Sequence, residues 1–119
     1  MLKPLLKSAP RTTPLIRVYM NYICFNEPAA KLLGLKEGDS VSIMEDDRDG
    51  YIYVANAVTK QSYVLTCRNN TFKVSNRRLC RKLAEALDGF GSYKIISSES
   101  LEFMDKIYYN IFKCKYGED

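Results

Sequence analysis

The sequence predicts an α+β domain in which antiparallel β hairpins form a barrel-like sheet with two short helices. Segments rich in β-branched and aromatic residues recur along the chain, polar turns separate them, and two helical segments each follow a residue that can cap a helix. A chain of 119 residues is long enough for one compact domain. We expect a flexible basic arm over residues 1–14, which contain three prolines together with Ser and Thr, followed by a single domain over residues 15–119.

The first half of this domain begins with a strand over residues 15–25, broken near Asn21. Asn26 can cap the short helix that follows, and Gly34 can end it in the left-handed conformation. An Asp-Gly pair, which is typical of hairpin turns, then separates two more strands. These strands are expected at residues 41–45 and 51–54.

The second half repeats the order of strands and helix. Two strands come first, at residues 63–67 and 71–74, and Ser75 is expected to cap a helix over residues 76–87. A strand at 93–97 should end in a turn at Ser98, Glu99 and Ser100. The apolar pattern of 101–114 fits a helix or a strand, and its period of two favours a strand at 107–113. The shared order indicates either an internal duplication of a strand-helix-hairpin unit, with halves 15–58 and 63–114, or two similar local solutions.

The composition argues against most catalytic designs. The chain has no His, which removes the commonest general base and metal ligand. Its four cysteines form no Cys-x-x-Cys pair, so we expect reduced, buried thiols and no metal site or cofactor. We also expect the acidic turn between Glu45 and Asp49 to be a solvated hairpin tip. From this composition we expect a protein that is not an enzyme. No secretory signal or membrane span is visible, so we expect it in the cytoplasm and without a membrane partner.

Charge is unevenly distributed along the chain. The first 20 residues carry four basic and no acidic side chains, and residues 60–98 carry eight basic against two acidic ones. Residues 21–59 instead carry seven acidic and three basic side chains. Such asymmetry is typical of a protein that binds a polyanion, although a mixed solvated surface can also produce it.

The predicted second helix is the main candidate contact surface. Its helical periodicity places Arg and Lys on one arc and Leu and Cys on the other. Arg77 and Arg78 fall in its first turn, where free N–H groups and guanidinium groups together favour a phosphate. The alternative is an ordinary solvated face on which Glu85 pairs with Arg81. The candidate nucleic-acid-binding residues are Arg17, Arg68, Lys73, Arg77, Arg78, Arg81 and Lys82.

Residues 25–54 resemble the AbrB/MazE-type swapped-hairpin DNA-binding family. The resemblance rests on the motif Leu-Gly-Leu-x-x-Gly-Asp at residues 33–39, followed by an alternating strand, turn and strand. Asp39 ends this motif and can hold its turn through side chain to backbone hydrogen bonds. The chain departs from the family at Asn26, where Pro is usual, and at Ala30, where Arg is frequent. Members of the family form their barrel from two chains, and a duplicated chain could supply both halves.

The resemblance and the charge pattern lead to the same expected function. This is a non-enzymatic nucleic-acid-binding or regulatory module, similar to a transcription regulator, of a bacterium or mobile element. The pattern leaves DNA, RNA and an acidic protein open as partners. The alternative is a structural or protein-interaction module, in which the acidic hairpin or an exposed β edge binds another chain or a second copy in a homodimer.

Overall fold

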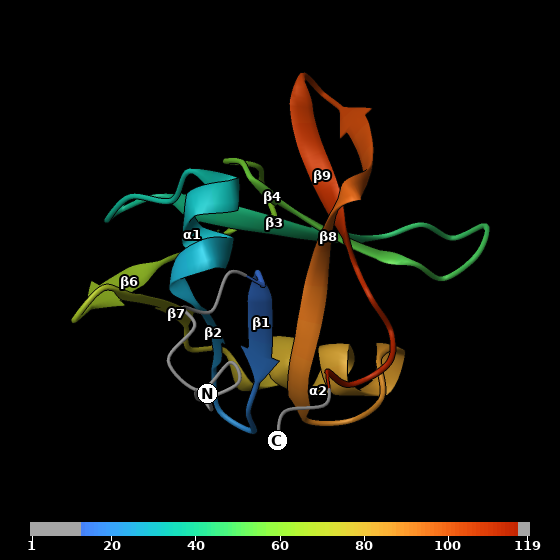
Figure 1. Ribbon diagram of the computed structural model, residues 1–119, viewed down its shortest axis with the longest axis horizontal. Coiled ribbons are helices and arrows are strands. Elements are labelled where there is room, and N and C mark those ends of the chain that lie inside the picture. The colour runs from blue at the N-terminus through green and yellow to red at the C-terminus, as the bar shows by residue number, and fades with distance from the viewer. Residues whose placement is uncertain (1–12, 117–119) are drawn as a thin grey trace, which may run out of the picture.

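The structure is a computed structural model that describes residues 13–116. Within these residues, nine strands form one sheet and two helices pack against it, which confirms the predicted antiparallel α+β fold (Figure 1). The strands are β1 (Leu15–Val18), β2 (Ile23–Phe25), β3 (Ser40–Glu45), β4 (Ile52–Asn56), β5 (Tyr63–Val64), β6 (Thr66–Arg68), β7 (Thr71–Val74), β8 (Gly91–Phe103) and β9 (Lys106–Ile111). The helices are α1 (Glu27–Leu33) and α2 (Arg77–Ala86). Except for Thr13 and Pro14, the arm predicted for residues 1–14 lies outside the described residues.

The sheet closes almost completely into a barrel. Its strand order is β5-β3-β4-β9-β8-β1-β2-β7-β6, and every neighbouring pair is antiparallel. The two edge strands, β5 and β6, are separated along the chain by Leu65 alone. Leu65 is buried, and its N–H donates to the Asp39 carbonyl at 2.8 Å. The chain therefore passes directly from one edge of the sheet to the other.

The two halves of the chain alternate around this sheet. The first half supplies the β1–β2 hairpin, α1 and the β3–β4 hairpin, and the second supplies the β6–β7 hairpin, α2 and the β8–β9 hairpin. Between the halves, β2 pairs with β7, β4 pairs with β9, and β1 pairs with β8. The predicted strand 15–25 is thus a hairpin, broken where its turn lies.

Helix α1 begins and ends where the sequence predicts. The Asn26 side chain accepts a hydrogen bond from the Ala29 N–H at 3.0 Å, and Gly34 follows the helix with a φ of 66°. The Leu-Gly-Leu-x-x-Gly-Asp motif continues into a turn that Asp39 holds, because its carboxylate accepts from the Lys36 N–H at 2.9 Å. This turn leads directly into β3.

Helix α2 begins one residue later than predicted. Its cap is Asn76, whose side chain accepts from the Leu79 N–H at 2.9 Å, and the prediction of Ser75 as the cap is wrong. Both residue types are good caps, so the sequence alone did not decide between them. At the other end, the Tyr93 hydroxyl accepts from the Asp88 N–H at 2.8 Å and donates to the Gly89 carbonyl. The buried Tyr93 side chain thereby fixes the loop that follows the helix.

Strand β8 is much longer than the predicted strand 93–97. The turn expected at residues 98–100 is wrong, because β8 continues through it as a strand. The pairing with β9 changes register there: Ile96 faces Asn110, and the next pair is Ser100 with Tyr109. The polar residues therefore mark a bulge, which bends a strand and increases its twist, instead of ending it. The predicted strand at 107–113 corresponds to β9, so the strand interpretation of this segment is confirmed.

Two apolar clusters stabilise the fold. The larger one lies between the sheet and the helices, and Phe25, Leu83 and Tyr93 are among its buried members. The smaller one contains Tyr108 with Ala55 and Ala57, and Leu101 and Tyr53 pack against it. Its position shows that the β8–β9 hairpin packs against β4 through side chains as well as through backbone hydrogen bonds.

Candidate nucleic-acid interface

Two of the predicted site residues lie in one row across the sheet. Arg17 on β1 faces Cys24 on β2, and Cys24 in turn faces Lys73 on β7. Their chain neighbours Val18 and Ile23 are buried in the larger cluster, so the alternation of strand side chains directs this row to the outer face. The sheet register therefore places a thiol between two cations.

The thiol in this row does not add a negative charge. Partial burial raises the pKa of Cys24 above its ordinary value, and the nearby charges of Arg17 and Lys73 oppose this effect without overcoming it. Cys24 is thus protonated at neutral pH and acts as a small spacer between the cations. The four cysteines are free thiols within the described residues, but the expectation that they are buried holds only for Cys80, because Cys24 and Cys67 are partly buried and Cys114 is exposed.

Arg68 belongs to the same outer face. It faces Thr71 in the β6–β7 hairpin, and Lys73 follows two residues later on the same strand. The hairpin turn is Asn69-Asn70, and both residues have positive φ values, of 51° and 63°. A two-residue turn with positive φ values matches the twist of the strands that it joins, so the pairing of Arg68 with Thr71 is regular. Residues that face each other, and residues two apart on a strand, share one side, so Arg68 and Lys73 lie on the same side of the hairpin. We name Arg17, Arg68 and Lys73 the sheet cations.

Lys73 is further oriented by an aromatic side chain. Its Nζ lies 4.7 Å from the centre of the Tyr22 ring, and Tyr22 in turn lies 4.7 Å from the ring of Tyr19. Both tyrosines belong to the turn between β1 and β2. A cation over a ring face is held electrostatically, so the ammonium group is positioned before any ligand arrives. These tyrosines were not among the residues predicted from the sequence, because their contact with Lys73 depends on the pairing of β2 with β7.

The other four predicted residues, the helix cations, lie on α2. Leu79, Cys80 and Leu83 pack into the larger cluster and leave the opposite arc of the helix in solvent. All four helix cations are exposed, and they are Arg77, Arg78, Arg81 and Lys82. Among residues 13–116 no carboxylate forms an ion pair with any of them, so the pairing of Glu85 with Arg81 that the alternative interpretation included is absent there.

The helix cations divide between two sides of α2. Arg78 and Lys82 line a cleft of about 490 Å³, whose apolar wall includes Ile43 and Tyr63 and whose rim includes Glu45. Helical spacing places Arg77 and Arg81 together on the side away from this cleft. The chain leads from Lys73 through Ser75 and Asn76 into α2, so the sheet cations and helix cations adjoin along the sequence.

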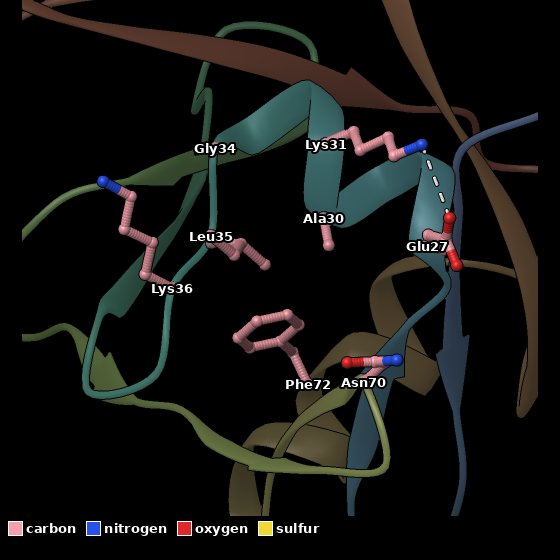
Figure 2. Close-up of a pocket in the computed structure, with 8 residues that line it drawn as sticks. All are labelled: Glu27, Ala30, Lys31, Gly34, Leu35, Lys36, Asn70 and Phe72. Carbon is pink, nitrogen blue, oxygen red and sulfur yellow. Dashed lines mark ion pairs between the residues drawn. The ribbon is translucent and has the colours of Figure 1, made fainter.

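A second cleft lies beside α1. It has a volume of about 430 Å³, and Figure 2 shows the Phe72 ring pointing toward Leu35 and Ala30 across it. Lys31 on its rim forms an ion pair with Glu27 at 3.4 Å, and Lys36 points away from the ring. An exposed pair of this kind contributes little to stability, so Lys31 stays available to a ligand. This cleft was not predicted from the sequence, because Phe72 comes from β7, far along the chain from α1.

The acidic turn between β3 and β4 is a solvated hairpin tip, as expected. Arg48 folds back on Asp46, and its Nη2 lies 3.0 Å from Oδ2. This contact lowers the pKa of Asp46, first through the hydrogen bonds that Arg48 donates and then through its charge. The Asp49 carboxylate accepts from the Tyr51 N–H at 2.9 Å. Throughout residues 13–116, no three or more cysteine or carboxylate side chains are grouped so that they could hold a metal ion.

Comparison of the chain with family models, with curated proteins and with solved structures finds no match in any of the three. Neither helix within the described part of the chain is long and apolar enough to span a membrane.

Proposed function

We propose that this protein is a non-enzymatic nucleic-acid-binding module with a regulatory role, and that the sheet cations and helix cations hold phosphate groups. The observation that carries the proposal is the outer arc of α2, where four exposed cations have no carboxylate partner among residues 13–116. Guanidinium groups bind phosphate in a two-pronged geometry that fixes the position of a backbone, and three of the four helix cations are arginines.

The first turn of α2 is the most favourable place for a phosphate. Arg77 and Arg78 stand where the positive end of the helix dipole lies, and each exposed cation there costs about 0.3–1 kcal/mol. Among the described residues the Asn76 side chain caps the Leu79 N–H alone, so other N–H groups of this turn can donate to a ligand. A phosphate would offset the repulsion between the two arginines and the helix dipole, and it would accept hydrogen bonds from those N–H groups. Both effects would increase the affinity for phosphate.

We further propose that the chain is an internal duplication of the swapped-hairpin unit. The two caps, Asn26 and Asn76, are 50 residues apart, and each accepts from the N–H three residues ahead. The central pairs, β2 with β7 and β4 with β9, each join equivalent strands of the two halves. A single chain would then provide the barrel that the AbrB/MazE-type family builds from two chains. Sedimentation equilibrium tests this, with 13.7 kDa expected for a monomer and twice that mass contradicting it.

Binding to a random-sequence DNA duplex tests the proposed function. We expect binding at 50 mM salt, with an affinity that falls as salt rises, because each neutralised phosphate adds about 0.9 to the slope of log affinity against log salt. Four contacts give a slope of about −3.6, and the double variant Arg77→Ala, Arg78→Ala should lower its magnitude by about 1.8. A duplex RNA in the same assay shows whether the surface distinguishes the two nucleic acids.

The matched control removes two cations from other parts of the surface. Lys60 lies in the loop after β4, and Lys106 lies at the start of β9, and both are exposed. The double variant Lys60→Ala, Lys106→Ala has the same net charge as the arginine variant and should keep the original slope. No binding at low salt, or equal losses in the two double variants, would show that α2 is not the contact surface.

A further inference from the structure

The β3–β4 and β8–β9 hairpins enclose a cleft that the nucleic-acid proposal does not use. It has a volume of about 390 Å³ and lies between the acidic tip of the first hairpin and the outer part of the second. Figure 1 shows the β8–β9 hairpin projecting beyond the rest of the sheet. The apolar lining of the cleft consists of Met44, Tyr53, Leu101, Phe103 and Tyr108.

The apolar lining is held in place by contacts within the protein. Met44 faces Tyr53 across the β3–β4 ladder, so their side chains share one face of the sheet. Tyr108 is buried, and its hydroxyl donates to Ser42 Oγ at 3.0 Å. The Phe103 ring meets the Tyr108 ring edge to face, with centroids 6.0 Å apart. The cleft therefore exists before a ligand arrives.

Negative charge surrounds this lining. Glu45, Asp46 and Asp47 come from the β3–β4 tip, and only Asp46 has a cation partner among the described residues, which is Arg48. Arg48 also lines the cleft, but its side chain is 82% exposed and pairs with Asp46, so Glu45 and Asp47 leave the rim with a net negative charge.

The acidic side chains also affect Tyr53, which lines the cleft. Desolvation raises the pKa of Tyr53, and the negative charges of Asp49, Asp46 and Glu99 raise it further. Glu99 comes from the bulge in β8, so carboxylates of both hairpins act on one ring. A cation entering the cleft would thus contact carboxylates of the β3–β4 tip, while Glu99 acts on the same ring from outside the cleft.

Exposed apolar side chains extend beyond the cleft along the β8–β9 tip. Phe103, Met104 and Ile107 are 47%, 78% and 53% exposed. The turn itself is Met104-Asp105, with positive φ values of 55° and 65°. A methionine is an unfavourable residue at such a turn position, and there its side chain points into solvent, where it gains no burial. Apolar groups gathered at a projecting tip are typical of a surface that binds another protein.

We propose that this cleft binds a basic segment of another protein, with an Arg or Lys side chain entering between the rings and the acidic rim. Ring faces and carboxylates both attract a cation, and neither attracts a phosphate backbone. A neighbouring apolar residue of the same segment covers the Phe103 and Met104 side chains, which a small cation would leave in water. The proposal does not depend on nucleic-acid binding, because the two surfaces carry opposite charge and share only Glu45, which borders both clefts.

A peptide panel tests this proposal with the full chain. The probes are fluorescently labelled nine-residue peptides that carry two Arg and two Leu at all spacings in a Gly-Ser background, and matched peptides in which Gln replaces Arg. Fluorescence polarisation measures their affinity, and NMR chemical-shift changes locate the bound peptide. We expect at least one Arg peptide to bind more tightly than its Gln counterpart and to shift Met44, Tyr53 and Leu101.

Charge variants of the rim then identify the site. Replacing two exposed acids, Glu45→Gln with Asp47→Asn, should weaken the best Arg peptide about tenfold, as expected for the loss of two exposed charge contacts. The control variant Glu37→Gln, Glu85→Gln changes net charge equally at exposed positions that do not line this cleft, and should bind as the original protein does. Met104→Ser should weaken binding without changing the acidic rim.

Several results would overturn the proposal. They are equal affinity for Arg and Gln peptides, an unchanged affinity of the Glu45→Gln, Asp47→Asn variant, or chemical-shift changes confined to α1 or α2. Concentration-dependent self-association that involves the same resonances would show that a second copy, not another protein, occupies the cleft. A nucleic-acid result of either sign leaves these outcomes unaffected, so the two proposals fail separately.

Discussion

The two helix caps make unequal numbers of hydrogen bonds, and their removal should therefore destabilise the protein unequally. Asn26 Oδ1 accepts from the Ala29 N–H at 3.0 Å and also from the Leu15 N–H at 2.9 Å, while its Nδ2 donates to the Thr13 carbonyl at 2.9 Å. Within residues 13–116, the Asn76 side chain makes only the cap bond to Leu79. The Asn26 side chain thus joins α1 to the start of β1, whereas Asn76 serves its own helix.

The expected cost of each Asn→Ala change follows from these bonds. Loss of a cap costs about 1 kcal/mol, which is our expectation for Asn76→Ala. In Asn26→Ala the N–H of Leu15, a buried residue, also loses its partner, which adds about 1–2 kcal/mol. We therefore expect Asn26→Ala to lower the free energy of unfolding by about 2–3 kcal/mol.

Urea unfolding followed by far-ultraviolet circular dichroism measures both changes, since the chain has no Trp to report by fluorescence. The slope of the unfolding free energy against urea concentration should be the same for all variants, so that the urea midpoints alone report the differences in stability. Asn26→Asp keeps the acceptor oxygen and loses the donor amide, so its free energy of unfolding should lie between those of the original protein and Asn26→Ala. Equal costs for the two alanine variants would refute the reasoning, because the bonds to residues 13 and 15 would then contribute nothing.

Three further predictions concern buried or reactive groups. Tyr93→Phe should cost about 1–2 kcal/mol in urea unfolding. Since burial raises the pKa of Tyr93, its contribution should persist to about pH 10, the ordinary tyrosine value, and be lost at higher pH, so the Phe variant should lose stability less steeply there. Alkylation followed by mass spectrometry should modify Cys114 first and Cys80 last, because the former is exposed and the latter buried; the reverse order would contradict the fold. A double-mutant cycle of Tyr108→Phe and Ser42→Ala should give a coupling of about 0.5–1.5 kcal/mol, and additive costs would show that their hydrogen bond contributes nothing.

The sequence predicted those elements whose ends are set by residues close by in the chain. The first helix begins at an Asn cap and ends at Gly34, and both features rest on interactions within a few residues. The length of β8 was not predictable in the same way. Ser98, Glu99 and Ser100 have the composition of a turn, but β9 pairs beyond them and keeps the segment in the sheet. Pairing over a distance overrides local preference in strands more readily than in helices.

The candidate sites also differ in whether they depend on nearby residues or on pairing between distant strands. The exposed arc of α2 follows from helical periodicity, which any single helix displays in its sequence. The row that places Cys24 between Arg17 and Lys73 depends on the register of three strands, two of which are about 50 residues apart. The cleft beneath the β8–β9 hairpin depends on a bulge as well. Neither could be inferred from the order of residues alone.

The alternation of the two halves around the sheet has a consequence for how the protein is made. On the ribosome, β4 is complete long before β9, which is its neighbour, and β1 must wait for β8. The early hairpins therefore emerge with unsatisfied backbone edges and exposed apolar faces, and they stay so until β8 and β9 have left the exit tunnel. The sheet therefore cannot be completed before β9 is available, and until then chaperones can bind the exposed segments of the nascent chain.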